Sequence, residues 1–257
     1  MPVYLRPVLC DNLAMAWLEV KNLTLKEKDA LFLSELSFSL EKGTITLLAG
    51  RNGSGKSMLL KSLKGLLPAD GSICLDGKEL KRRERLRSIG LVFQETALQI
   101  VGSTVEKDVA FGPENLGLEK SEIAKIVDAV IAELGLEKVR TKNPSDLSGG
   151  ERRMLSIAGV IAMSPSIILL DEPLANLDYP ATVNVIKTLI KLKEAGFTIL
   201  IASHEAEKFL AHTDRTIIMR GGKIVSDRKS EDSLDALKKY GIYIPPKLTF
   251  KELSWAE

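Results

Sequence analysis

The chain has few of the features that mark secreted, membrane-spanning or strongly charged proteins. Cys10 and Cys74 are the only cysteines among 257 residues, too few for a disulfide framework, and a reducing cytoplasm is the simplest setting. No apolar run approaches the roughly 18 residues of a membrane span, and the amino terminus lacks the pattern of a secretion signal. The net charge is only +2, so the whole molecule exerts no general pull on nucleic acid or anionic lipid. We therefore expect a chain that does not itself cross a membrane.

The composition is that of a globular protein with a substantial core, since 45% of the residues are hydrophobic and 27% are charged. Short strand-like segments alternate with segments of helical spacing, and residues 44–49 are apolar enough to be buried on both faces. Buried strands are also indicated by "SIGLVFQ", "SIILLDEP" and "FTILIASH". This alternation predicts an α/β protein with a mainly parallel sheet.

The pattern divides the chain into parts. Residues 17–94 and 166–230 carry the strand signals and are expected to form the α/β core, including an antiparallel β subdomain near the amino terminus. Residues 95–165 change to helix and loop, with one apolar stripe that ends at Gly135. We expect 95–165 to be an inserted α-helical subdomain and 231–257 to be a short carboxyl-terminal tail.

The segment Gly50–Ser57, "GRNGSGKS", fits the phosphate-binding pattern G-x-x-x-x-G-K-[ST] and lies between a strand and a helix, as that motif requires. Its glycines allow backbone N–H groups to curl around phosphates at a helix start. Lys56 adds a positive charge, and the Ser57 hydroxyl is a candidate Mg²⁺ ligand. We expect a P-loop NTPase core with ATP held by Asn52, Gly53, Ser54, Gly55, Lys56 and Ser57.

Polar residues at the ends of three predicted strands supply the remaining candidates. Asp171 and Glu172 end "SIILLDE", where Asp171 can hold Mg²⁺ and Glu172 can orient or deprotonate an attacking water. Gln94 is a candidate contact for Mg²⁺ and water, and His204 for the γ-phosphate. Taken alone, Gln94 or His204 is more often a satisfied polar strand end. Their positions at adjacent strand ends favour a catalytic role.

A second glycine-rich segment, "SDLSGGERRM", lies almost a hundred residues after the first. A serine hydroxyl and exposed N–H groups at a helix start make a second anion site, too remote in sequence to be assumed part of the first. Arg152 and Arg153 follow it, and solvated charge or intrachain pairing is at least as reasonable for them as phosphate contact.

The order of "GRNGSGKS", Gln94, "LSGGE", "IILLDEP", "ANLD" and His204 resembles that of the ATP-binding-cassette (ABC) ATPases over residues 18–230. In that family two cassettes close head to tail over two ATP molecules. The resemblance implies that Ser148, Gly149 and Gly150 contact the ATP of a partner and that Asp178 lies at the contact between protomers. It also implies ATP hydrolysis with Mg²⁺ bound by Ser57, Gln94 and Asp171.

Further segments, "TVEKDVAFGPENLGL" and "GIYIPPKL", resemble the ATPase components of energy-coupling-factor and cobalt-type importers of vitamins or metals. That resemblance implies a peripheral subunit on the cytoplasmic face of the cell membrane. Its partners would be a second ABC ATPase, with a related chain favoured over a homodimer, a transmembrane scaffold subunit and a substrate-binding membrane subunit. The scaffold would dock on the insertion near Gln94.

The chain departs from the family pattern at several positions. Glu151 replaces the usual glutamine of the signature, Leu174 a frequent threonine, and Asn176 a usual glycine. Glu27 takes the place of the aromatic residue that stacks on adenine. Phe32 can substitute for that aromatic or belong to the core, and adenine stacking is left unassigned.

Two other functions compete with the importer interpretation. A soluble cassette ATPase acting on nucleic acid or the ribosome is suggested only by the basic run "KRRERLR" at 81–87, which is more often a solvated face, and no nucleic acid is expected as a partner. A degenerate cassette that binds ATP without hydrolysis is disfavoured because Lys56, Asp171, Glu172 and His204 are all present.

Overall fold

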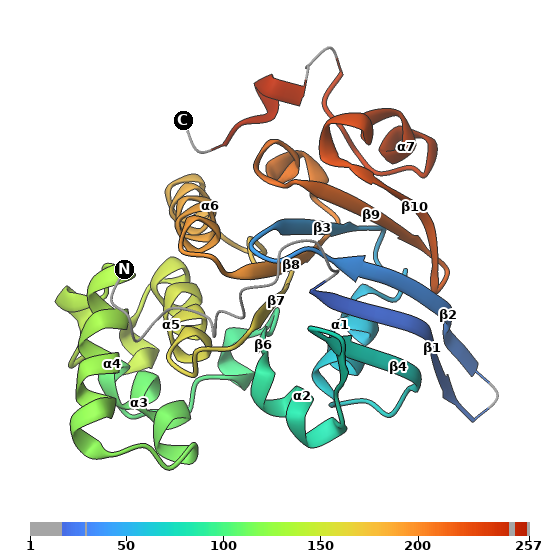
Figure 1. Ribbon diagram of the computed structural model, residues 1–257. Helices are drawn as coiled ribbons and strands as arrows, with labels where there is room; N and C mark the ends of the chain where they lie inside the picture. Colours follow the sequence, from blue (N-terminus) through green and yellow to red (C-terminus); the bar gives the residue numbers. More distant parts are fainter. Residues whose placement is uncertain (1–16, 29, 247–249, 256–257) are drawn as a thin grey trace.

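The computed structural model describes residues 17–28, 30–246 and 250–255 and contains two β-sheets with helices around them (Figure 1). The smaller sheet is antiparallel, with the strand order β2-β1-β4-β5. Its strands are β1 (Leu18–Glu27), β2 (Ala30–Leu40), β4 (Asp70–Leu75) and β5 (Lys78–Glu79). The antiparallel part expected near the amino terminus is therefore present.

The larger sheet has the strand order β10-β9-β3-β8-β7-β6, and all of its neighbouring strands are parallel except β10 and β9. Its strands are β3 (Ile45–Ala49), β6 (Ile89–Val92), β7 (Ile167–Asp171), β8 (Thr198–Ser203), β9 (Arg215–Arg220) and β10 (Lys223–Lys229). Every residue of β3, β6, β7 and β8 is buried, as expected for strands covered on both faces. The α/β class predicted from the sequence is confirmed.

The helices longer than one turn are α1 (Lys56–Lys64), α2 (Arg82–Ser88), α3 (Val105–Asn115), α4 (Lys120–Glu133), α5 (Gly149–Ile161), α6 (Tyr179–Glu194) and α7 (Leu234–Lys239). Residues 95–165, all of them described, contain helices, short 3₁₀ turns and loops but no strand. In the described part of the chain no helix is both long and apolar enough to cross a membrane.

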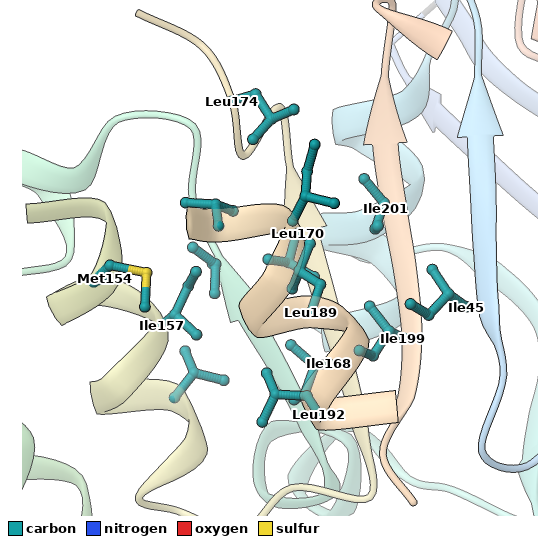
Figure 2. Packing of buried hydrophobic residues seen from close by; sticks show 14 of the residues in the cluster. Ile45, Met154, Ile157, Ile168, Leu170, Leu174, Leu189, Leu192, Ile199 and Ile201 are labelled. Atoms are coloured by element: carbon teal, nitrogen blue, oxygen red, sulfur yellow. The ribbon is translucent and has the colours of Figure 1, made fainter. Parts of the chain in front are cut away.

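Two hydrophobic clusters cover the two faces of the larger sheet. One joins it to α1 and to the antiparallel sheet, and includes Leu59, Leu60 and Leu63, which recur at helical spacing on α1. The other joins it to α5 and α6, where Met154 and Ile157 lie on one side of a layer formed by Leu189 and Leu192 (Figure 2). The core thus fixes the carboxyl ends of β3, β6, β7 and β8 as one rigid edge, and α5 is packed against it.

Candidate functional site

The loop Gly50–Ser57 leaves the carboxyl end of β3 and enters α1, as the sequence predicts. A Cβ atom on Gly50 would lie 2.5 Å from Ser54 Oγ, and Gly55 has a φ of +103°, so both positions require glycine. Ser54 is 6% exposed, and its hydroxyl has no hydrogen-bond partner within the described chain. A buried hydroxyl is costly when unpaired, and here it lies in a loop shaped to receive phosphate oxygens.

Lys56 is buried at the start of α1, yet its ammonium group is well paired. Nζ donates to the Gly50 carbonyl at 2.7 Å and lies 3.2 Å from Glu172 Oε1. The phosphate loop and the acidic end of β7 are therefore joined directly by this cation. Because Glu172 shares the cation, any anion entering the loop would compete with Glu172 for Lys56.

Ser57 and Asp171 meet across 114 residues of sequence, since Ser57 Oγ donates to Asp171 Oδ1 at 3.0 Å. Burial raises the pKa of Asp171, and the hydrogen bond from Ser57 opposes that rise. A hydroxyl and a carboxylate are hard oxygen ligands, and Mg²⁺ is commonly held by one or two carboxylates together with substrate phosphates. The pair therefore fits a magnesium ion at the mouth of the phosphate loop.

Glu172 is held in a fixed orientation at the end of β7. Ser203 Oγ donates to its Oε2 at 3.1 Å, and the His204 backbone N–H donates to its Oε1 at 3.2 Å. His204 Nδ1 lies 2.9 Å from the same carboxylate. The carboxylate is thus oriented by three groups from the end of β8, which is the arrangement a general base needs.

One pocket gathers the expected residues of the first site. It is lined by Phe32, Asn52, Gly53, Ser54, Gly55, Lys56, Ser57, Met58, Gln94, Glu172 and His204. Gln94 is exposed there, at the end of β6. Asp171 is not among the lining residues but reaches the pocket through Ser57. The structure therefore brings together every residue that the sequence assigns to the chain's own nucleotide.

Phe32, which the sequence left undecided, lines this same pocket and is half-buried against the hydrophobic cluster beside it. Glu27 is exposed at the end of β1 and is not among the pocket's lining residues. Phe32 is thus both a core residue and the aromatic side chain at this pocket. Its position is therefore compatible with both of the roles that the sequence left open.

The residues of the second glycine-rich segment lie in a different groove. Ser148, Gly149 and Gly150 line it together with Asp178 and with residues around them, and no residue lines both this groove and the phosphate-loop pocket. Ser148 caps α5, where its Oγ accepts from the Glu151 N–H at 3.2 Å, and Asp178 caps α6, accepting from the Ala181 N–H at 2.9 Å. Two helix amino termini with capping acceptors therefore open into one groove.

Comparison with known proteins decides the family, because the family described as "ABC transporter" matches residues 33–175. The chain belongs to the ABC transporter family. The resemblance read from the sequence is therefore confirmed, as is the expected fold of a P-loop ATPase cassette. ABC cassettes hydrolyse ATP, and this chain carries that ATPase domain.

The relatives of this ABC chain include ATP-binding proteins named for energy-coupling factor transporters and for cobalt import. It is 39% identical over 225 residues to the energy-coupling factor transporter ATP-binding protein EcfA2 of Clostridium perfringens, covering 83% of this chain and 79% of the relative. It is 37% identical over 238 residues to the cobalt import ATP-binding protein CbiO of Syntrophus aciditrophicus, covering 89% and 85%. A solved structure of cbiO1 from Clostridium perfringens, described as part of the ABC transporter complex cbiONQ, superposes with a TM-score of 0.79 at 30% identity, covering 90% of this chain and 96% of that one.

The departures from the ABC pattern have local structural explanations. Asn176 has a φ of +61°, a conformation that glycine favours and that asparagine tolerates better than most residues. Leu174 is buried in the hydrophobic cluster that joins the larger sheet to α5 and α6. The chain therefore keeps the backbone path before Asp178 without the usual glycine.

Glu151 takes the place of the usual signature glutamine and completes a capping box with Ser148. Its Oε2 accepts from the Ser148 N–H at 2.7 Å, and hydrogen bonding by Ser148 lowers the pKa of Glu151. A glutamine side-chain oxygen can accept the same bond. The substitution therefore preserves the helix start and adds a negative charge beside the groove.

Replacing Glu151 by glutamine is expected to change the thermal unfolding temperature at pH 7 very little, whereas Glu151→Ala should cost about 1 kcal/mol because the backbone donor loses its partner. Since the folded-state pKa is lowered, the wild-type side chain stabilises the fold above the unfolded pKa and loses that effect as the pH falls through the folded value. Thermal melts of both variants from pH 3 to pH 7 test this. Equal destabilisation by glutamine and alanine would contradict the capping role.

The basic run at 81–87 is only partly a solvated face. Arg82 Nε donates to the Gly65 carbonyl at 2.9 Å, and an Arg85 guanidinium nitrogen donates to the Ser62 carbonyl at 2.8 Å. Glu84 pairs with Lys78 at 2.7 Å. These side chains close the carboxyl end of α1, so the run that suggested nucleic acid has a structural use.

The structure also shows residues near the site that the sequence did not assign. Arg153 and Gln99 hydrogen-bond the backbone of Phe93 and Gln94, and Ser203 orients Glu172. For Ser203, its position directly before His204 was an available signal. Arg153 and Gln99 bond to backbone atoms of other segments. No spacing in the sequence indicates such bonds.

Proposed function

We propose that this chain binds and hydrolyses ATP to energise a membrane importer of the energy-coupling-factor type, for a vitamin or a transition-metal ion. The observation that carries the proposal is the single pocket shared by the phosphate loop, Gln94, Glu172 and His204. The relatives named as ATP-binding proteins of energy-coupling-factor and cobalt importers support this type of transport.

Phosphate binding would be the work of the loop and of Lys56. Residues 52–57 line the pocket at the start of α1, where backbone N–H groups and the helix dipole would favour anions. Lys56 already points to the loop, because the Gly50 carbonyl and Glu172 hold its ammonium group. On ATP binding Lys56 would exchange its contact with Glu172 for phosphate oxygens, which leaves the carboxylate free to act.

Ser57 and Asp171 would hold Mg²⁺, with Gln94 as a further contact. A Mg²⁺ ion held there would supply positive charge that stabilises the negative charge developing on the phosphate oxygens. Burial raises the pKa of Asp171 because its ionised form is held away from water, an effect that nearby positive charge would offset. A cation at this carboxylate would supply that charge.

Glu172 would accept a proton from the attacking water, with Ser203 and the His204 N–H holding its carboxylate in place. His204 contacts Glu172 through Nδ1, so its other ring nitrogen is available to the γ-phosphate. Side chains positioned in this way typically contribute about 10²–10⁴-fold to proton-transfer steps.

The second groove would serve the ATP of a partner. Ser148, Gly149 and Gly150 line a groove separate from the chain's own phosphate loop, and Asp178 lies beside them. We propose a head-to-tail dimer with a second ABC ATPase, a related chain being favoured because this chain departs from the family pattern at Glu151 and Asn176. Closure would shield the γ-phosphates from bulk water.

The membrane partner would dock on the helical segment that follows Gln94. The exposed large apolar side chains of this segment include Leu98, Val101 and Phe111, at 73%, 59% and 48%. Contiguous apolar patches on a protein surface mark interaction sites, and we propose that these side chains contribute to one. We propose that they receive a transmembrane scaffold subunit, which carries the substrate-binding membrane subunit and keeps this chain peripheral on the cytoplasmic face.

The same proposal assigns a role to each part of the chain. Residues 17–94 and 166–230 would form the nucleotide-binding core. Residues 95–165 would form the helical subdomain that carries both the docking surface and the signature segment, and residues 231–257 would form a short tail. Two of the basic side chains in the run at 81–87 bond to backbone carbonyls at the end of α1, so these two serve the fold of this chain.

Replacing Leu98 by glutamate is expected to reduce recovery of the membrane scaffold roughly tenfold or more, because a charge would be buried in an apolar contact. The matched control is Leu31→Glu, since Leu31 is 52% exposed on β2 in the antiparallel sheet. Each tagged variant is extracted gently from native membranes, and the co-purified subunits are identified by mass spectrometry. The wild type and the control should recover a second ABC ATPase and a multi-span scaffold. Recovery of ribosomal proteins or nucleic acid without a membrane subunit would contradict the importer proposal.

A further inference from the structure

A buried arginine connects the signature helix to the backbone beside the nucleotide pocket. Arg153 lies in α5 and is 3% exposed. Its Nη1 donates to the Phe93 carbonyl and its Nη2 to the Gln94 carbonyl, both at 2.8 Å. The planar guanidinium thus spans two consecutive carbonyls, a geometry that a lysine ammonium cannot reproduce.

Burying the Arg153 guanidinium is energetically unfavourable. Burial lowers the pKa of Arg153, and attraction to Asp171 only partly opposes that effect. Its Nε has no hydrogen-bond partner among the described residues. Removing a guanidinium from water without a close carboxylate partner is unfavourable, so stability alone does not account for this side chain.

Gln99 makes a second connection between the same two elements. Its Oε1 accepts from the Phe93 N–H at 3.1 Å, and its Nε2 donates to the Ser156 carbonyl of α5 at 2.9 Å. The backbone of Phe93 and Gln94 is therefore tied to α5 by donors and acceptors on both sides. Movement of this loop independently of α5 would break all of these bonds.

The signature residues and Arg153 share one rigid element. Ser148 caps the start of α5, and Arg153 follows five residues later, roughly 7.5 Å along the helix axis. At its start α5 therefore presents the groups proposed to touch a partner's ATP. One turn further on it holds the backbone of Gln94, which lines the chain's own ATP pocket.

We propose that Arg153, assisted by Gln99, is a positioning residue that makes the Gln94 loop and the signature helix move as one body, and so couples the two ATP sites through the interior of each chain. The inference rests on the roles proposed above for Gln94 and Ser148. Contact of Gln94 with the chain's own nucleotide then positions the signature segment for the partner's nucleotide. Because such coupling is reciprocal, contact of the signature segment with the partner's nucleotide also positions Gln94.

The test uses Arg153→Met in the full chain assembled with its partner ATPase. ATP turnover per folded assembly is expected to fall by roughly 10- to 100-fold, since small displacements of catalytic groups cost this much, while ATP affinity changes less than about threefold. The matched control is Arg152→Met, which removes the same charge from the same helix. The Arg152 guanidinium bonds to the Leu147 carbonyl and not to the backbone of Phe93 and Gln94. Arg153→Lys should show a turnover between that of Arg153→Met and that of the wild type, because a lysine ammonium lacks the planar pair of donors that spans the two carbonyls.

A double-mutant cycle separates positioning from a structural role. When Gln94→Ala is already present, adding Arg153→Met is expected to lower ATP turnover by less than about twofold. The Gln94 side chain that Arg153 is proposed to position is then already absent. An undiminished second loss would overturn the proposal, as would a lowered melting temperature with unchanged turnover per folded protein. If Gln94→Ala alone has no effect, the role proposed for Gln94 fails, and this inference falls with it.

Should Arg153→Met fail to fold, Gln99→Leu provides an independent break of the same connection. It removes both bonds made by Gln99 without leaving a buried charge unpaired. The same cycle with Gln94→Ala applies, with a smaller expected loss of roughly threefold to tenfold, because the two Arg153 bonds remain. Full additivity of Gln99→Leu with Gln94→Ala would overturn the coupling.

Discussion

Glu172→Gln is expected to lower ATP turnover by roughly 10²–10⁴-fold, the usual contribution of a positioned general base. Glutamine keeps the shape of the side chain, and its single oxygen, placed where Oε2 lies, can still accept from Ser203 Oγ at 3.1 Å and from the His204 N–H at 3.3 Å. It cannot take a proton from water. The loss should therefore lie in the chemical step and leave the fold intact.

The same substitution should strengthen ATP binding and trap the closed dimer. Glu172 lies 3.2 Å from Lys56 Nζ, so removing its charge frees the lysine for phosphate. With hydrolysis blocked, sedimentation in ATP should show a stable assembly with the partner ATPase, which the wild type forms only transiently. Glu205→Gln is the matched control, because Glu205 pairs with Lys208 and is not among the pocket's lining residues. Unchanged turnover, or unchanged assembly with every candidate partner, would contradict the role of Glu172.

Lys56→Met is expected to weaken ATP binding by about 2–5 kcal/mol, the usual cost of removing one member of a buried, hydrogen-bonded charge pair. Methionine retains the length and most of the apolar contacts of the side chain. It leaves Glu172 without the cation at 3.2 Å and the phosphates without their lysine. Titration calorimetry with ATP measures the effect directly.

The control for Lys56→Met is Lys61→Met, which removes a lysine from the last turn of the same helix. It should retain ATP affinity within about threefold, since it lies outside the residues that line the phosphate-loop pocket. Melting curves without nucleotide establish that both variants are folded. Equal loss of affinity in the two variants would mean that Lys56 acts only through the general charge of α1.

Local chemistry explains why the first site could be predicted from the sequence. A strand, a glycine-rich loop and a helix follow one another within Thr44–Leu67, so their geometry is fixed by neighbours in the chain. Asp171, Glu172 and His204 each end a buried parallel strand, and the carboxyl ends of such strands meet at one edge. The structure brings these residues together in that way.

The parts that the sequence missed depend on tertiary contacts. The sequence allowed intrachain pairing for Arg153 but not its partners, because they are carbonyls 59 and 60 residues away and backbone acceptors leave no residue-type pattern. Helix α2 lies in a basic run whose composition is also that of a solvated face, so the sequence did not indicate it as a helix. Phe32 joins the pocket through the antiparallel sheet, which no local spacing reveals.

The central claim, that Ser148–Gly150 serve a partner's nucleotide, is tested most directly by photolabelling the assembly with an ATP analogue that carries its reactive group on the γ-phosphate. This chain would carry Lys56→Met, so that its own loop is impaired, and would be assembled with a partner ATPase that keeps its lysine. For a homodimer, a differently tagged wild-type chain is that partner. We predict that peptides containing residues 145–154 of this chain remain labelled. If Lys56→Met abolished labelling of these peptides, the result would contradict the account, because the signature segment would then face the nucleotide of its own chain.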